Sequence, residues 1–115
     1  MKDSLFVDGG ALDWRPTPCV GVAWKKLYFD AHSGESAVLL RFEPGATYDA
    51  HRHPGGESYL VLEGELEDSG RRWGPMTYVR HAPASAHRPH SPTGALVFVS
   101  LPRPIEPLAG ALSAS

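Results

Sequence analysis

GATYDAHRHPGGESYLVLEG, residues 45–64, concentrates side chains that transition metal ions prefer as ligands. His51 and His53 are two residues apart, and at this spacing the side chains of an extended strand point to the same face. Residues 54–56, Pro-Gly-Gly, cannot continue a regular strand, so a turn is expected there. The run that begins at Glu57 is again rich in strand-forming residues. The resulting hairpin would return Glu57 towards the two imidazoles, which predicts a cluster of metal ligands.

Composition narrows the class of protein. The 115 residues are one domain's length, and a net charge of −2 without any long Lys/Arg run argues against a nucleic-acid partner. No apolar stretch approaches the ~20 residues that span a bilayer, and residues 1–14 lack the apolar region of a secretory signal. Cys19 is the only cysteine, which excludes an internal disulfide and fits a reducing compartment. We therefore expect a cytoplasmic protein without a membrane or nucleic-acid partner.

Proline and glycine divide the chain into short pieces that are typical of strands. The sequence holds 11 Pro and 12 Gly, and no window of twelve residues has clean helical periodicity. This pattern predicts an all-β sandwich or barrel. The expected strands cover residues 21–29, 36–43, 57–62, 65–68, 71–73, 76–80 and 95–101, and residues 81–94 are expected to be largely irregular because of their prolines. Residues 1–19 are predicted to form an arm, 20–101 the folded body, and 102–115 an extended tail with a disordered end.

The spacing of the first cluster resembles a known family motif. Gly45, His51, His53, Glu57 and Gly64 match the first motif of the cupin superfamily position for position. Cupins usually take a further histidine ligand from a second motif, and His81, His87 and His90 are the candidates here. The superfamily pattern alone points to His87, although Ala82 and Ala84 stand where it has proline and glycine.

A narrower resemblance favours His87. HRHPGGE, the following YLVLEGELED and the PxSxHxPxS pattern of residues 83–91 resemble the cupin-like domain of ChrR-type anti-sigma factors, over roughly residues 14–101. This resemblance implies a single cupin β-barrel, or jelly roll, that binds one metal ion. The implied ligands are His51, His53, Glu57 and His87, and His81 and His90 would lie around the site or in solvent. The chain departs from the family pattern at Ser58, His81, Ala84 (in place of a turn glycine) and Ala95.

The resemblance also suggests functions for the site. Three imidazoles and a carboxylate suit Fe(II) or Zn(II), with Mn or Ni as alternatives. Related proteins resemble acetylacetone-type dioxygenases, which implies a non-haem metal dioxygenase acting on a small diketone-like carbonyl compound, with Glu57 as fourth ligand or acid/base group. Candidate walls of a substrate cavity are Phe42, Tyr48, Tyr59, Tyr78 and Phe98, although the core is the commoner location of such residues.

Two alternatives remain open at this stage. A ChrR-like cupin could be a metal-binding sensor without turnover, in which case no substrate-sized cavity is expected beside the metal. A metal-free structural barrel is disfavoured because all four ligands are present.

Only about twenty residues with one cysteine precede the first expected strand, so we do not expect this chain alone to bind a sigma factor. The apolar side chains of residues 5–14 would be exposed to water unless they pack against another surface. We therefore expect a homodimer.

Overall fold

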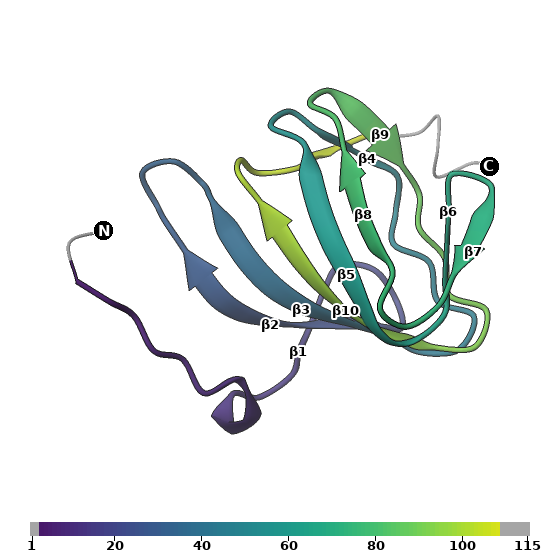
Figure 1. The fold of residues 1–115 in the computed structure, drawn as a ribbon, viewed down its shortest axis with the longest axis horizontal. Coiled ribbons are helices and arrows are strands. Elements are labelled where there is room, and N and C mark those ends of the chain that lie inside the picture. The colour runs from purple at the N-terminus through teal and green to yellow at the C-terminus, as the bar shows by residue number, and fades with distance from the viewer. Residues whose placement is uncertain (1–2, 109–115) are drawn as a thin grey trace.

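The strands form three antiparallel sheets in a computed structural model that describes residues 3–108 (Figure 1). The largest sheet has six strands in the order β1 (Arg15–Pro16), β2 (Val22–Phe29), β3 (Ser36–Phe42), β10 (Ala95–Leu101), β5 (Glu57–Gly64) and β8 (Tyr78–His81). A second sheet has the order β11 (Glu106–Pro107), β4 (His51–His53) and β9 (Ser85–His87). The third sheet is the hairpin of β6 (Leu66–Asp68) and β7 (Arg71–Trp73).

Alternation of apolar side chains defines the inner face of the six-stranded sheet. In β10, Val97 and Val99 are 1% and 4% exposed, whereas the alternating residues Leu96, Phe98 and Ser100 are half-buried. Their neighbours on β3 and β5 are Val38, Tyr59 and Val61, which are also buried. This period-two pattern packs one face of the sheet into the core and leaves the other on the outside.

The architecture is an open jelly roll, because the sheets face one another without closing into a continuous barrel. The all-β prediction is confirmed, and the one helical segment within residues 3–108 is the 3₁₀ turn η1 (Gly9–Ala11). Within the same residues, no helix has the length and hydrophobicity that a membrane crossing requires.

The proline-rich segment of residues 81–94 is largely irregular, as the sequence predicts, but it contains one short strand that was not predicted. Ser85–His87 forms β9 and pairs with β4 in antiparallel register. Pairing with an existing strand therefore outweighs the local effect of Pro83 and Pro89, which lie outside the three paired residues. Ala84, just before β9, has a φ of 69°, so it adopts the left-handed conformation of the glycine that the family pattern places there.

Both ends of the body contain short paired segments. Within the predicted arm, β1 pairs with the edge of β2, and the residues before η1 extend away from the sheets (Figure 1). Within the predicted tail, β11 pairs with β4, so the chain after β10 returns to the strand that carries two of the histidines. The predicted disordered end, residues 109–115, lies outside the described part of the chain.

Candidate metal centre

Strands β4 and β9 bring three histidines together. Their register pairs His51 with His87 and His53 with Ser85, so these four side chains lie on one face of the small sheet. His51 and His53 are 4% and 0% exposed, whereas Arg52 between them is exposed. The HxH spacing therefore places both imidazoles inside the jelly roll, as the strand periodicity predicts.

The turn after β4 brings Glu57 into the same cluster. Gly56 has a φ of +83°, and a Cβ at this position would lie 2.8 Å from the carbonyl oxygen of His81. A side chain at this position would therefore be strained and crowded against the backbone. The Gly56 N–H donates to the His53 carbonyl, which closes the turn, and Glu57 begins β5 with 7% of its surface exposed.

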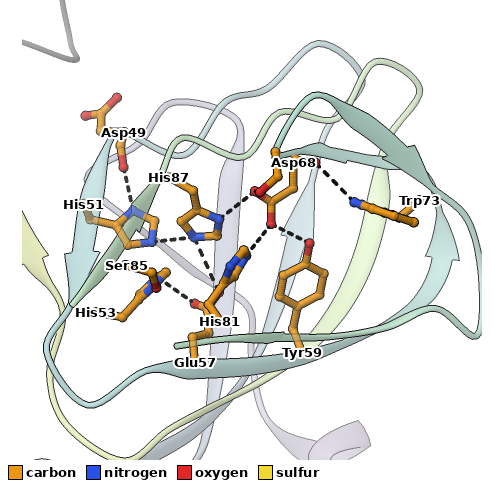
Figure 2. A network of polar contacts seen from close by, with 11 residues as sticks. Asp49, His51, His53, Glu57, Tyr59, Asp68, Trp73, His81, Ser85 and His87 are labelled. Atoms are coloured by element: carbon orange, nitrogen blue, oxygen red, sulfur yellow. Dashed lines mark hydrogen bonds and ion pairs between the residues drawn. The ribbon is translucent and has the colours of Figure 1, made fainter. Parts of the chain in front are cut away.

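The donor atoms of these four residues have the separations expected around one metal ion (Figure 2). Nε2 of His51 and Nε2 of His87 are 3.0 Å apart, and the Glu57 carboxylate lies 3.3 Å from His53 Nε2 and 3.4 Å from His87 Nε2. Ligands bound at about 2.1 Å to one ion are separated by about 3.0–3.4 Å, depending on the coordination geometry. The cluster therefore has the dimensions of a single first coordination sphere.

Hydrogen bonds on the opposite side of each ring fix which nitrogen faces the centre. Nδ1–H of His51 donates to the Asp49 carbonyl at 2.7 Å, and Nδ1 of His53 lies 3.3 Å from the Ser85 hydroxyl. Nδ1–H of His87 donates to the Asp68 carboxylate at 3.0 Å. Nε2 of His51 and Nε2 of His87 are thereby left as lone-pair donors that point inward.

Two buried polar atoms of the cluster lack a hydrogen-bond partner, namely Nε2 of His53 and Oε1 of Glu57. Unsatisfied buried groups of this kind are costly, and inward-facing lone pairs repel one another. A divalent cation bound by these atoms would remove both penalties. The donor set, three imidazoles and one carboxylate, fits a transition metal ion.

Burial keeps His51 in the protonation state that metal binding needs. Desolvation is the main cause that lowers the pKa of His51 from its ordinary value of 6.5 to about 4, so this imidazole is neutral at pH 7. The nearby Tyr48 ring lies edge-on to His51, and burial raises the pKa of its phenol to about 12. Neutral imidazole is the form that coordinates metal ions.

Asp68 was not predicted from the sequence, yet its carboxylate connects most of the groups around the cluster (Figure 2). It is 4% exposed and accepts hydrogen bonds from His87, His81 and Tyr59, the last at 2.6 Å. Burial alone would raise the pKa of Asp68, but the contacts with His87, Tyr59 and His81 outweigh it and hold the pKa well below its usual range. Asp68 therefore stays ionised and orients His87 towards the donor cluster.

A signal for Asp68 was present in the sequence. Leu66 and Asp68 are two residues apart in a strand, so their side chains lie on the same face. If Leu66 is buried, Asp68 is buried as well. Residues 65–68 were predicted only as a strand of a short hairpin, and no role was assigned to Asp68. Its histidine partners follow 13 and 19 positions later, so the local pattern gave no indication of them.

The other candidate histidines lie outside the four-donor cluster. His81 stacks on His53 with ring centroids 5.8 Å apart, and its Nε2 is 2.8 Å from Asp68. Asp68, His81 and His87 form a second group with the dimensions of a metal site, and it shares His87 with the first. His90 instead contacts the Thr47 hydroxyl through Nδ1 at 2.8 Å.

A cavity of about 190 Å³ adjoins the donor cluster, and His51, Glu57 and His87 form part of its wall. Of the aromatic residues proposed as cavity walls, Phe42, Tyr48 and Tyr59 line this cavity. Tyr78 is 60% exposed, and Phe98 is paired with Leu60 on the outer face of the sheet. These two side chains are not among the residues of the cavity wall.

Comparison with protein families gives one match over most of the chain. A family model described as the ChrR cupin-like domain matches residues 2–103. A search of curated proteins gave no significant match.

Solved structures with the same fold include two dioxygenase-type proteins and an anti-sigma factor. A candidate acetylacetone dioxygenase from Methylibium petroleiphilum PM1 has a TM-score of 0.90 and 19% identity, with 97% of this chain and 85% of that chain covered. An acetylacetone dioxygenase from Acinetobacter johnsonii has a TM-score of 0.83 and 14% identity, with 97% and 81% covered. ChrR bound to SigE from Rhodobacter sphaeroides has a TM-score of 0.69 and 24% identity, with 80% and 49% covered. At these identities the likeness establishes the fold.

His53→Ala is expected to abolish stoichiometric metal binding, because His53 is fully buried and supplies one of the converging donors. A metal at a hundredfold excess over its dissociation constant stabilises the folded state by about 2.7 kcal/mol, so loss of binding should lower the melting temperature by about 10 °C. Elemental analysis and thermal unfolding with and without chelator measure both effects. His32→Ala, in an exposed turn, is the control, and unchanged metal content and melting temperature in His53→Ala would contradict the assignment.

Asp68→Asn is expected to weaken metal binding by about 10- to 100-fold while the protein stays folded. An amide cannot accept hydrogen bonds from both His87 and His81 with its two terminal atoms, so the orientation of His87 is lost. Competition with a chromogenic chelator gives the dissociation constant. Glu67→Gln is the matched control, because the adjacent Glu67 carboxylate is paired with Arg72 outside the cluster. An affinity within twofold of the wild-type value would refute this role of Asp68.

Proposed function

This chain belongs to the ChrR cupin-like domain family, and from that membership we propose that it is a mononuclear non-haem metal dioxygenase acting on a small carbonyl compound of the diketone type. The observation that carries this proposal is the cavity of about 190 Å³ beside the donor cluster, since a sensor without turnover has no need of one. The fold shared with acetylacetone dioxygenases supports the same choice.

The proposed metal ligands are His51, His53 and His87, with Glu57 completing the set or acting on the substrate. Bound Fe(II) would supply Lewis-acid and redox chemistry towards a carbonyl substrate and dioxygen. The three imidazoles are held by their Nδ1 contacts, so they would keep the ion at the end of the cavity.

Glu57 is the candidate acid/base group. Its carboxylate is buried, faces the cavity and has one oxygen without a hydrogen-bond partner. The carbon between two carbonyls is acidic, and Oε1 of Glu57 is suited to accept its proton. Tyr48, with a pKa of about 12, stays protonated beside His51 and could donate a hydrogen bond to a substrate carbonyl.

The second candidate function is a metal-binding sensor or regulatory module. Four converging protein donors support it, because four fixed ligands complete a tetrahedral zinc site. In that case Glu57 would be a permanent ligand and zinc the resident metal. The two functions therefore differ in metal identity and in the role of Glu57.

The test of the proposed function is oxygen consumption by protein purified without a tag, chelator or air. We expect near one iron per chain and oxygen uptake with acetylacetone or benzoylacetone. Glu57→Gln should lower turnover by about 10²- to 10⁴-fold with iron retained if Glu57 moves the proton. Loss of iron in the same variant would assign Glu57 as a ligand. Zinc at one per chain with no oxygen uptake would refute the dioxygenase and support the sensor.

We also propose that two copies of the chain form a homodimer through the N-terminal arm, defined here as residues 3–14. Leu5, Phe6 and Val7 are 52%, 90% and 42% exposed, and the residues before η1 lead away from the body of their own chain (Figure 1). Apolar side chains at this exposure favour association with a second surface.

The outer face of the six-stranded sheet offers that surface. Cross-strand pairing aligns a row of side chains that are half-buried or exposed and mostly apolar, namely Leu39, Phe98, Leu60 and Tyr78. Part of the arm already lies over this face, since Gly9 is next to Leu27 and Leu39. A stable dimer buries about 800 Å² on each partner, so both the arm and the sheet face of each copy would take part in the contact.

Size-exclusion chromatography with light scattering tests the dimer. The wild-type chain should have the mass of two copies, and Phe6→Asp should shift it to one copy because a charge cannot be buried there without a partner. Val20→Asp is the control, since Val20 is 94% exposed and lies outside the arm. A monomeric wild-type chain at all concentrations would refute the proposal.

A further inference from the structure

The cavity beside the donor cluster is apolar along most of its wall. Side chains such as Val38, Leu40, Val97 and Val99 line it between the two facing sheets. Lys26 is the only lysine or arginine on this wall among residues 3–108. The cavity therefore combines metal ligands, an apolar middle and one cationic group.

Lys26 and the donor cluster lie at opposite ends of this cavity. The strand registers align Lys26, Val38, Val99 and Tyr59 in one row across β2, β3, β10 and β5. Neighbouring strands are about 4.8 Å apart, so Lys26 is about 14 Å along the sheet from Tyr59. Glu57 precedes Tyr59 by two residues on the same face, which puts the donors at the far end.

Two aromatic rings hold the Lys26 side chain at its end of the cavity. Its ammonium lies 4.7 Å from the centroid of the Trp24 ring and 5.7 Å from that of Phe29. All three residues line the cavity, and Lys26 has no carboxylate partner within the described part of the chain. Its charge is thus available to a bound molecule. The side chain of the preceding residue, Lys25, lies on the opposite face of the sheet, where its ammonium donates to the Gly9 carbonyl.

We infer that the cavity binds a small organic anion with three parts: carbonyl oxygens at the metal end, an apolar or aromatic body, and an acidic group that reaches Lys26. This inference rests on the proposed function, because it assigns the Lys26 end of the cavity to the same substrate that the metal end would bind. An apolar wall favours the body of such a molecule, and the single cation selects for a negative charge at one end.

The experiment uses two probes that differ only at the far end. Benzoylacetone is a neutral aryl diketone, and its para-carboxylate adds one negative charge to the ring. Dissociation constants are measured without oxygen by isothermal titration of the metal-loaded full chain. The variants are Lys26→Met, which keeps an apolar stem, Lys26→Arg, which keeps the charge, and Lys25→Met as the control on the other face.

The wild-type chain should bind the carboxylate probe about twofold to fivefold more tightly than the neutral one, as expected for an ion pair with the exposed Lys26. Lys26→Met should lose this preference while its affinity for benzoylacetone stays within twofold. Lys26→Arg and Lys25→Met should keep the preference. The inference is overturned if the wild-type chain binds neither probe or lacks the preference, or if Lys26→Met retains it.

Oxygen uptake then separates the two proposals. A preference that depends on Lys26, without oxygen consumption by any loaded protein, supports the ligand class and refutes the dioxygenase. Oxygen consumption with both probes that is equal in the wild-type chain and Lys26→Met supports the dioxygenase and refutes the ligand class.

Discussion

The candidate metal centre depends on the pairing of β4 with β9. This ladder has only three residue pairs, yet it aligns His51 with His87 and His53 with Ser85. A slip of one residue would turn His87 to the outside, since successive side chains of a strand face opposite ways. The ladder is reinforced at both ends, by the Ala84 N–H donated to the His53 carbonyl and by the Asp68 contact to His87. The register of this ladder therefore determines the positions of the three histidine donors.

The interior of this jelly roll contains more ionisable groups than a purely structural core would. Burying imidazoles and carboxylates costs free energy unless they are paired, and one carboxylate oxygen and one imidazole nitrogen of the cluster are unpaired. The two buried acids have different environments. Asp68 has its hydrogen bonds satisfied by protein groups and orients a neighbour, whereas Glu57 keeps an oxygen directed at the converging nitrogens. This difference supports the proposal that Glu57 acts on the metal or the substrate, whereas Asp68 orients His87.

The parts of the site that follow from local sequence periodicity could be predicted from the sequence. The HxH spacing predicts that His51 and His53 share one face of a strand, and Pro-Gly-Gly predicts that the chain reverses after it. The structure has both features. The choice between His87 and His90 could not be made locally, because it depends on register with a strand more than thirty residues earlier. Asp68 was missed because its partners are also distant in sequence. Strand β9 was missed because prolines flank it, and Ala84 adopts a conformation that the family pattern reserves for glycine.

The segment after β10 contains none of the four donors, yet Pro104 and Ile105 form part of the cavity wall and β11 pairs with β4. Pro104 packs so closely against Gly34 that a Cβ at position 34 would lie 2.4 Å from its ring. Part of the cavity wall is thus encoded in a stretch of the chain that supplies none of the donors. Substitutions in this short segment and in the β2–β3 turn would therefore change the shape of the cavity while all four donor residues stay in the chain.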